Sequence, residues 1–302
     1  MVTSSQAIAA LFAPHRRKGL NRAPCRGRIL RMTEPTQFDL FADLPTAPPA
    51  QNPGAASRMV ATELSDAALI EALPDASLGE ARALAEEAGR RRLGDAVGAL
   101  VALCQRFIGF GLDRRVPEQI AALEAFCAIG GPEAARAVQR MIVRQIVEGP
   151  NLAAAVAAAA ALGVKLSPEA ALPLLRHADP LLRAAACGCV RAGGDVVPVL
   201  TAMLSDHDDE AAVAAACALG RMGRAEARGA LKRWLVAKPS TRVIEALAGV
   251  ADEEAVVYLA RLGRKRPDLA HGILAALEEI ELPMAAVAAK ALASWLSRSD
   301  RG

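Results

Sequence analysis

The chain of 302 residues is 53% hydrophobic, 3% aromatic and 23% charged, and its formal net charge is +3. The bulk of the apolar residues are Ala and Leu, which are strong helix formers, so the composition indicates a helical protein whose helices approach closely. The longest uncharged apolar run, residues 152–164, is shorter than the roughly 20 residues that a membrane-spanning helix needs. We therefore expect no transmembrane segment and no membrane partner.

Residues 1–31 form a basic leader. They contain seven basic residues and no acidic one, so the remainder, with 36 − 7 = 29 basic and 33 acidic side chains, has a net charge of −4. The leader resembles an organellar transit peptide in its arginine-rich, acid-free composition. The alternative is that translation begins at Met32, and the Ala, Arg and Gly richness of the chain, typical of a GC-rich bacterial genome, favours it. Under both interpretations we expect a disordered leader.

Residues 32–58 follow as a second segment with few β-branched residues and five prolines. Its composition predicts a disordered tail. One apolar cluster interrupts it, and this cluster consists of Gln37, Phe38, Asp39, Leu40 and Phe41. Exposed Phe and Leu side chains in such a tail suggest that something binds them.

This pentapeptide resembles the bacterial sliding-clamp binding motif, Q-L-[SD]-L-F, and departs from it only at Phe38. The resemblance implies that Gln37 hydrogen-bonds on the clamp surface, Asp39 holds the bend, and Leu40 and Phe41 fill an apolar pocket. A lone motif of this kind should bind in the micromolar range. Two alternatives remain: the apolar side chains fold back as a cap on the first repeat, or the segment has no role.

From about residue 75 onward the chain repeats a helical-pair pattern with a period near 30 residues. The clearest copy has an apolar helix that runs into Gly220 and Gly223, after which a second helix starts at once. Similar copies occupy residues 118–131, 152–163 and 181–194, and we expect each terminal glycine to adopt the left-handed conformation that ends a helix. The pattern predicts an all-α, right-handed α-solenoid of about seven repeats over residues 59–298.

Two sequence blocks resemble the HEAT-repeat family, in particular the subtype named after phycobilisome lyases. Asp179, Pro180 and Arg183 stand in a block similar to D-P-x-V-R-x-A-A, and residues 218–223 are similar to A-L-G-x-x-G. The copies after residue 240 keep the period but lose the Gly-x-x-Gly. The resemblance implies a helical scaffold that binds other macromolecules.

Basic side chains recur at helical spacing on the second helices of several repeats. At a spacing of three or four residues they share one helix face. In HEAT-like proteins the second helices line the concave surface, so we expect these stripes to form a groove that contacts an acidic partner or a phosphate backbone. The residues are Arg136, Arg140 and Arg144 in one helix, Arg224, Arg228 and Lys232 in another, and Arg261 and Arg264 in a third.

Nothing in the sequence indicates catalysis, a metal or a cofactor. Motifs of phosphate-binding loops, serine hydrolases, zinc proteases and dinucleotide-binding folds do not occur. The acidic patch at residues 206–210 lacks the spaced ligands of a calcium loop, and we expect it to cap the next helix. Five of the six cysteines lie in apolar helical stretches, where we expect buried, reduced thiols, consistent with a cytoplasmic protein.

The sequence favours a non-enzymatic adaptor that binds a protein partner. The sharper hypothesis is an accessory protein of DNA replication or repair, tethered to the sliding clamp by Gln37, Leu40 and Phe41, with non-specific nucleic-acid contact through the arginine stripes. One alternative is a generic scaffold that assists assembly or modification of a partner. Another is a HEAT-like DNA glycosylase, whose concave site would need aromatic residues; Trp234 and Trp295 are better explained by packing.

Overall fold

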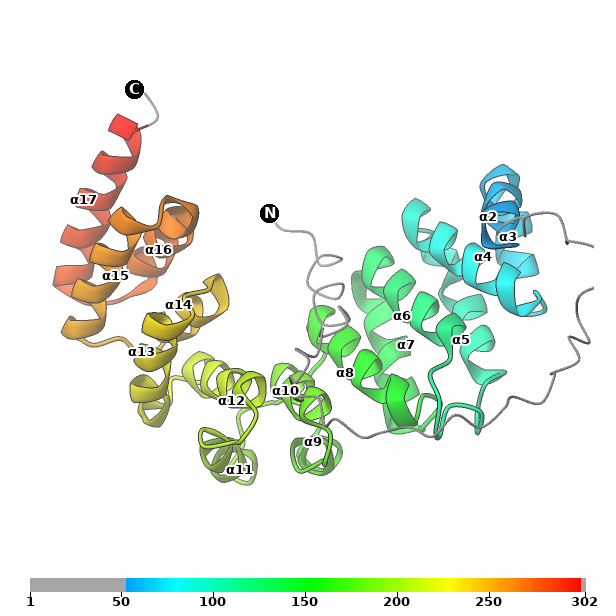
Figure 1. The fold of residues 1–302 in the computed structure, drawn as a ribbon, viewed down its shortest axis with the longest axis horizontal. Helices are drawn as coiled ribbons and strands as arrows, with labels where there is room; N and C mark the ends of the chain where they lie inside the picture. The colour runs from blue at the N-terminus through cyan, green and yellow to red at the C-terminus, as the bar shows by residue number, and fades with distance from the viewer. Residues whose placement is uncertain (1–52, 300–302) are drawn as a thin grey trace, which may run out of the picture.

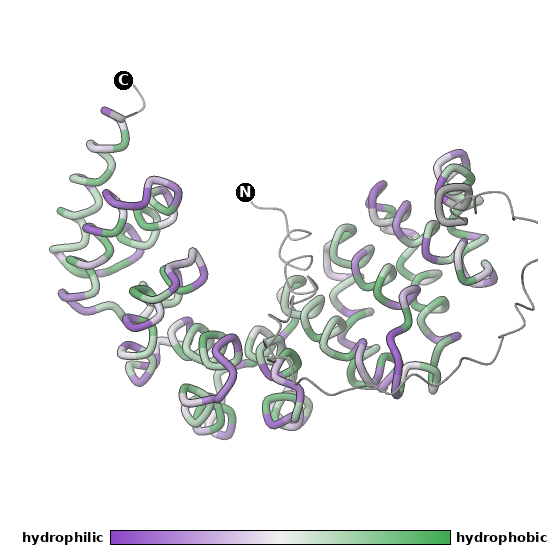
Figure 2. The backbone as a smooth tube through the Cα atoms, in the orientation of Figure 1, coloured by the Kyte–Doolittle hydropathy of each residue, from purple (hydrophilic) through white to green (hydrophobic). Residues whose placement is uncertain are grey.

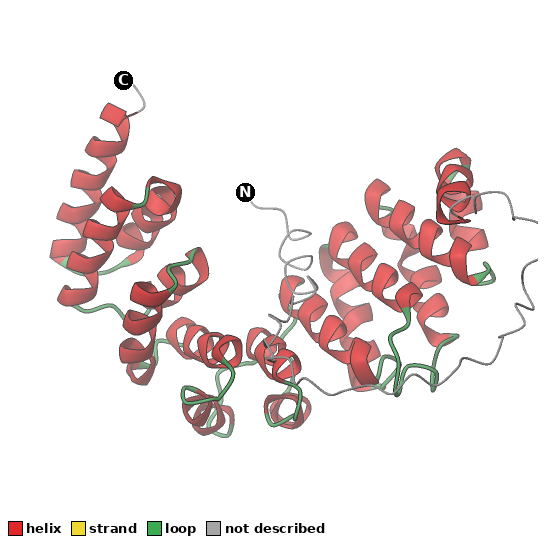
Figure 3. Ribbon diagram, in the orientation of Figure 1, coloured by secondary structure: helices red, strands yellow, loops and turns green. Residues whose placement is uncertain are grey.

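The computed structural model describes residues 53–299, and these form helices joined by loops, without a strand (Figure 3). The basic leader 1–31, the cluster Gln37–Phe41 and most of the expected tail 32–58 lie outside the described residues. The first described helix begins at Pro53, inside the stretch expected to be a tail. In chain order the helices are α2 (Pro53–Glu63), α3 (Asp66–Ala72), α4 (Leu78–Arg91), η1 (Gly94–Ala96), α5 (Val97–Gln105), α6 (Pro117–Ile129), α7 (Gly131–Val143), η2 (Gly149–Asn151), α8 (Leu152–Ala161), α9 (Pro168–Leu175), α10 (Pro180–Cys189), α11 (Val196–Met203), α12 (Asp209–Arg221), η3 (Ala225–Ala227), α13 (Arg228–Ala237), α14 (Thr241–Ala248), α15 (Glu253–Lys265), α16 (Pro267–Glu279) and α17 (Pro283–Ser299).

The helices stack as consecutive pairs into an arch (Figure 1). From residue 75 onward there are seven pairs, α4/α5 through α16/α17, and the pair α2/α3 precedes them. The prediction of an all-α solenoid of about seven repeats is therefore confirmed. Each pair buries its apolar face against the neighbouring pairs. The buried side chains therefore form one continuous hydrophobic core along the stack, from Ala61 in α2 to Leu292 in α17. Figure 2 shows the hydrophobic residues running along the helices, with hydrophilic residues gathered at many of the turns.

The first helices of the pairs form one layer and the second helices form another. In the inner layer α4, α6, α8, α10, α12, α14 and α16 pack on one another in series. In the outer layer the contacts between α5 and α7 and between α9 and α11 are less extensive, whereas α15 and α17 pack as extensively as α14 and α16. Figure 1 shows α10 and α12 toward the open side of the arch and α9 and α11 on its outer side. The inner layer therefore provides the concave face.

Small residues allow the inner helices to approach one another closely. A Cβ added at Gly188 of α10 would lie 2.6 Å from the Cβ of Ala160 in α8, and one added at Gly220 of α12 would overlap the carbonyl oxygen of Ala246 in α14. No bulkier residue fits at either contact. Close spacing in this layer and wider spacing in the outer layer bend the stack toward the inner helices.

Local sequence signals set the helix boundaries. Asp208 accepts a hydrogen bond from the backbone N–H of Ala211 over 3.0 Å, so the expectation that the acidic patch caps α12 is confirmed. Gly163 and Gly223 end their helices with φ near 70°, as expected. The expectation is wrong for Gly193 and Gly194, which have no positive φ, because Val190 after α10 is already extended.

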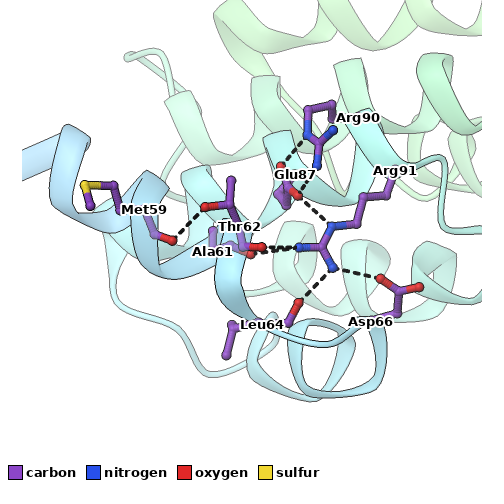
Figure 4. A network of polar contacts seen from close by, with 8 residues as sticks. All are labelled: Met59, Ala61, Thr62, Leu64, Asp66, Glu87, Arg90 and Arg91. Atoms are coloured by element: carbon purple, nitrogen blue, oxygen red, sulfur yellow. Dashed lines mark hydrogen bonds and ion pairs between the residues drawn. The ribbon is translucent and has the colours of Figure 1, made fainter.

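Arg91 of α4 fastens α2 and α3 to the rest of the solenoid (Figure 4). Its guanidinium donates to the carbonyl oxygens of Ala61, Thr62 and Leu64, which lie at and just past the C-terminal end of α2, over 2.8 to 3.2 Å. It also bonds Asp66, the first residue of α3, over 2.8 Å. A cation at a helix C-terminus satisfies carbonyls that have no partner within the helix. The N-terminal pair is thus held by specific polar contacts as well as by packing.

Candidate functional site

A groove runs across the inner layer where four successive helices, α8, α10, α12 and α14, contribute side chains. It has a volume of about 360 Å³. Its apolar lining consists chiefly of alanines, namely Ala157, Ala160, Ala184, Ala185 and Ala214. Because these side chains are short, the groove follows the backbone of the helices and is open to a partner that lies along the arch.

Charged side chains line the same groove. Arg242 of α14 pairs with Glu210 of α12 over 2.8 Å, and Lys165 donates to the carbonyl oxygen of Gly188 over 3.0 Å. Arg221, at the end of α12, is exposed, and its side chain makes neither a hydrogen bond nor an ion pair with any described residue. Three cations against one carboxylate give the groove a positive balance. It therefore suits a partner segment that carries negative charge.

Two thiols, those of Cys187 and Cys217, also line the groove. Burial raises the pKa of Cys187 to about 12 and raises the pKa of Cys217 as well, so both stay protonated near neutral pH. The five cysteines among the described residues are free, and four are buried while Cys127 is partly so. The predicted burial is confirmed for four of these five thiols, and Cys25 lies outside the described residues.

The stripe on α7 remains available to solvent. Arg136 and Arg140 are exposed and line a hollow of about 670 Å³ between α7 and the start of α5, together with Asp95 and Glu133. Arg144 is exposed just past the end of α7. None of these three arginines has an ion-pair partner among residues 53–299. The two acidic side chains at the hollow reduce its positive potential.

Two of the three basic side chains of the α13 stripe already have partners within the protein. Lys232 binds Asp252 over 2.9 Å and Glu254 over 2.6 Å, and the bond to Glu254 raises the pKa of Lys232. Arg228 donates to the carbonyl oxygen of Val250 over 2.6 Å. Arg224 precedes η3 and is exposed. These contacts join α13 to the connection between α14 and α15, so the side chains of Arg228 and Lys232 serve to hold two repeats together.

The third stripe flanks an apolar hollow at the C-terminal end of the arch. Arg261 and Arg264 of α15 line a hollow of about 180 Å³ with Met284 of α17. All three stripes lie on second helices, namely α7, α13 and α15, and so belong to the outer layer. The expectation that they line the concave surface is wrong. The small residues lie between first helices, and the solenoid bends toward that layer.

The acidic patch at residues 206–210 has structural roles. Asp206 pairs with Arg183, Asp208 caps α12, and Glu210 pairs with Arg242. Within residues 53–299 there is no group of three His, Cys, Asp or Glu side chains arranged to hold a metal ion. Trp234 is partly buried on the outer helix α13 and packs against the core.

The sequence did not single out Lys165, Glu210, Arg221 or Arg242 as parts of a common site. Glu210 and Arg242 are separated by 32 residues, about one repeat, and the repeat period was the available signal. A second surface was also missed: the loop between α5 and α6 exposes Ile108, Phe110 and Leu112. The sequence signal for this surface was an apolar stretch, interrupted by two glycines, that lies between predicted helices.

None of the described helices combines the length and the apolar character that crossing a membrane requires. A comparison with curated proteins finds no match to this chain. Residues 168–250, which span α9 through α14, match the family model for HEAT repeats. This match covers the inner-layer helices α10, α12 and α14 that line much of the groove. This stretch is therefore similar to HEAT repeats, and the helical pairs on either side of it pack in the same serial manner.

Proposed function

We propose that this protein is a non-enzymatic adaptor that binds a macromolecular partner along the inner layer of its solenoid. The observation that carries the proposal is the groove across α8, α10, α12 and α14, with its alanine floor and its three cations. HEAT repeats suggest a protein-interaction scaffold, and the match at residues 168–250 covers most of the helices that line the groove. The partner that fits best is a protein segment with acidic side chains.

The lining of the groove supports binding over base excision. Its side chains are alanines, two cysteines and charged residues, without an aromatic ring on which a flipped base would stack. The two tryptophans considered for such a site lie on α13 and α17, both in the outer layer. A glycosylase activity therefore has no support from this groove.

The finer part of the proposal concerns the partner that brings the protein to DNA. Gln37, Leu40 and Phe41 would bind the bacterial sliding clamp, and the groove would add a second contact to the clamp or to a protein bound there. Linking two weak contacts raises the overall affinity through effective concentration. The support is the motif together with its position in the sequence, 12 residues before α2.

Fluorescence anisotropy tests the tether. A labelled peptide of residues 33–45 is titrated with the sliding clamp, and a peptide with Leu40→Ala and Phe41→Ala serves as control. We expect micromolar binding that the control loses, because each apolar side chain contributes about 1.5 to 3 kcal/mol. Equal binding by both peptides, or by neither, would remove the clamp from the proposal.

A second titration tests the groove. Unlabelled full-length chain should displace the labelled peptide from the clamp at a lower concentration than unlabelled peptide does. Arg221→Glu with Arg242→Glu should abolish that advantage while leaving the affinity of the isolated peptide unchanged. Arg136→Glu with Arg140→Glu is the matched control on the outer layer. If the control pair reduces the advantage as strongly, the contact is not made by the groove.

DNA contact by the arginine stripes receives less support. The arginines of α7 and α15, which have no ion-pair partner among residues 53–299, lie on separate outer helices, and Arg228 and Lys232 of the α13 stripe are engaged in ion pairs. A phosphate contact would weaken steeply with salt, with a slope that grows with the number of phosphates neutralised. Binding to duplex DNA measured between 50 and 200 mM salt, roughly the range over which such contacts are lost, separates this candidate from a protein partner.

A further inference from the structure

The connection between α5 and α6, residues 106–116, exposes three large apolar side chains within five residues. Ile108 is 53% exposed, Phe110 is 58% exposed and Leu112 is 60% exposed. Single exposed apolar residues are ordinary, but a cluster of three on one loop marks a surface that another element covers. We call Ile108, Phe110 and Leu112 the apolar loop.

The ends of this connection are fixed to the solenoid. Arg106 donates to the carbonyl oxygens of Pro74 and Ala76, both over 2.8 Å, and so ties the start of the connection to the turn before α4. Asn151 donates to the carbonyl oxygen of Val116 over 2.9 Å at the other end. In the middle, a Cβ at Gly149 would overlap the carbonyl oxygens of Gly111 and Leu112, so the two backbones touch.

These anchors decide what the apolar loop can do. A loop with free ends could fold its apolar side chains against the core, but this one is held at both ends and at its middle. Its apolar side chains therefore stay in solvent unless a partner covers them. Covering them would stabilise a complex by about 25 cal/mol for each Å² of apolar surface removed from water.

The sequence on either side of the apolar loop is basic. Arg106, Arg114 and Arg115 flank it, against a single acidic residue, Asp113. The guanidinium of Arg114 lies 5.9 Å from the centre of the Phe110 ring, so positive charge sits directly beside an exposed aromatic face. A partner that combines acidic and large apolar side chains is complementary to this surface.

We propose that the apolar loop is the docking surface for residues 33–45 of the same chain. That segment has three acidic residues and no basic one. Its apolar side chains are Phe38, Leu40, Phe41 and Leu44, which alternate with or adjoin the acids. The acidic side chains of the segment are complementary in charge to the arginines beside the loop, and its apolar side chains can cover those of the loop.

The chain length permits this contact within one molecule. Phe41 precedes Pro53, the start of α2, by 12 residues, which span at most about 40 Å when extended. Helix α2 packs on α4, and Arg106 ties the connection to the turn before α4, so both the start of the solenoid and the apolar loop lie beside the same helix. Other exposed apolar residues occur near the start of the solenoid, at Met59 and Val60 of α2 and at Leu78 of α4, but they are not gathered on one loop. Met284 lies on α17, at the far end of the arch (Figure 1).

Docking would cover Leu40 and Phe41, the same side chains that the clamp would bind, so the two contacts exclude each other. This inference does not rest on clamp binding. Its test contains no clamp, and the direct titration of the clamp uses a peptide without the loop, so the failure of one leaves the other standing. In the competition with full-length chain, docking would oppose clamp binding, so that experiment is also run with Ile108→Ser, Phe110→Ser and Leu112→Ser, which remove the docking surface.

Peptide binding to the full-length chain tests the proposal. The labelled peptide 33–45 is titrated with a chain whose own segment is disabled by Phe38→Ala, Leu40→Ala and Phe41→Ala. We expect saturable binding in the micromolar range. The unmodified chain should bind the peptide at least about tenfold more weakly, because its own segment competes at a millimolar effective concentration.

Two further variants of the disabled chain locate the site. Ile108→Ser with Phe110→Ser and Leu112→Ser should weaken peptide binding at least about tenfold, because the apolar contact is lost. Val257→Ser with Val287→Ser, at exposed positions on α15 and α17, is the matched control and should change nothing. The positions that distinguish these two variants from the disabled chain are all exposed, and an unchanged melting temperature verifies that each variant folds.

Three results would overturn the proposal. The first is no binding by the disabled chain, and the second is equal affinity of the disabled and unmodified chains. The third is equal affinity of the loop variant and the control, which would put the peptide elsewhere on the solenoid. Loss of binding in Arg221→Glu, with the loop variant unaffected, would assign the peptide to the groove of the inner layer instead.

Discussion

Arg183 of α10 forms a two-pronged ion pair with Asp206: Nη2 donates to Oδ1 over 2.7 Å and Nε donates to Oδ2 over 2.8 Å, with both side chains only 8% exposed. The remaining N–H groups of the guanidinium reach the carbonyl oxygens of His177 and Ala178, each over 2.9 Å. Asp206 also accepts from the backbone N–H of Asp208. One side chain thus connects the end of α9 to the turn that starts the next repeat.

Arg183→Met should lower the free energy of unfolding by about 3 to 5 kcal/mol, because it leaves the buried Asp206 carboxylate without its cation. Chemical denaturation followed by circular dichroism measures the change. Arg176→Met, at an exposed position beside α9, removes the same charge and should shift the free energy by no more than about 0.5 kcal/mol. A loss in Arg183→Met no larger than in this control would mean that the pair does not join the two repeats.

Gly220→Ala should destabilise the solenoid by about 1 to 3 kcal/mol, because the new Cβ overlaps the carbonyl of Ala246 and forces α12 and α14 apart. Thermal unfolding gives the change in melting temperature. Gly229→Ala is the matched helical control: nothing lies within 4 Å of its added Cβ, and it should stabilise by up to about 1 kcal/mol. Similar shifts in both variants would contradict the close approach of the inner helices.

Glu87 makes the stability depend on pH. Hydrogen bonds from Arg90 and then Arg91 outweigh the opposing effect of burial and lower the pKa of Glu87 from 4.5 to about 2. Because the pKa is lower in the folded state than in the unfolded state, the stabilisation is fully present above about pH 4.5 and is lost as the pH falls toward 2. Denaturation midpoints measured from pH 6 to pH 2 should therefore decline in this window.

The Glu87→Gln variant isolates this contribution. It removes the titrating group while keeping most of the side chain's shape, so its midpoint should decline less steeply between about pH 4.5 and pH 2 than that of the unmodified chain. Parallel declines would show that other carboxylates cause the dependence.

Asn151→Leu should loosen the connection that carries the apolar loop. The amide of Asn151 donates to the carbonyl oxygen of Val116 over 2.9 Å and to Oε1 of Gln119 over 3.0 Å, and all of these groups are buried. Leaving two buried acceptors without a donor costs about 1 to 3 kcal/mol. Hydrogen exchange should accelerate at residues 106–116 and remain unchanged in α12 and α14. Uniform acceleration throughout the chain would indicate general destabilisation in place of a local anchor.

The architecture could be predicted from the sequence because its signals are local. Glycine placement, the aspartates before helices and the period near 30 residues predicted the pairs, and Asp208 and Gly223 act as expected. The direction of bending could not be predicted, because it depends on contacts between residues about 26 positions apart, such as Gly220 and Ala246. Gly220 itself looked like a helix end but lies inside α12 as a spacer.

Candidate sites were harder to predict, because charge spacing on one helix does not say what the next repeat offers. Arg228 and Lys232 share a face of α13, as predicted, yet Asp252 and Glu254 come from the following pair and occupy Lys232. The apolar loop was missed for a related reason. Its exposure follows from anchors at Pro74 and Asn151 that are distant in sequence.

The alanine floor of the groove has a consequence for selectivity. Alanine has no side-chain rotamers, so the surface it forms cannot adjust by repacking when a different ligand arrives. The fit of a partner must depend instead on the curvature of the whole arch. That curvature is the sum of small contributions from every contact between neighbouring helices. A substitution several repeats away from the groove can therefore change which partner is accepted without touching any residue that the partner contacts.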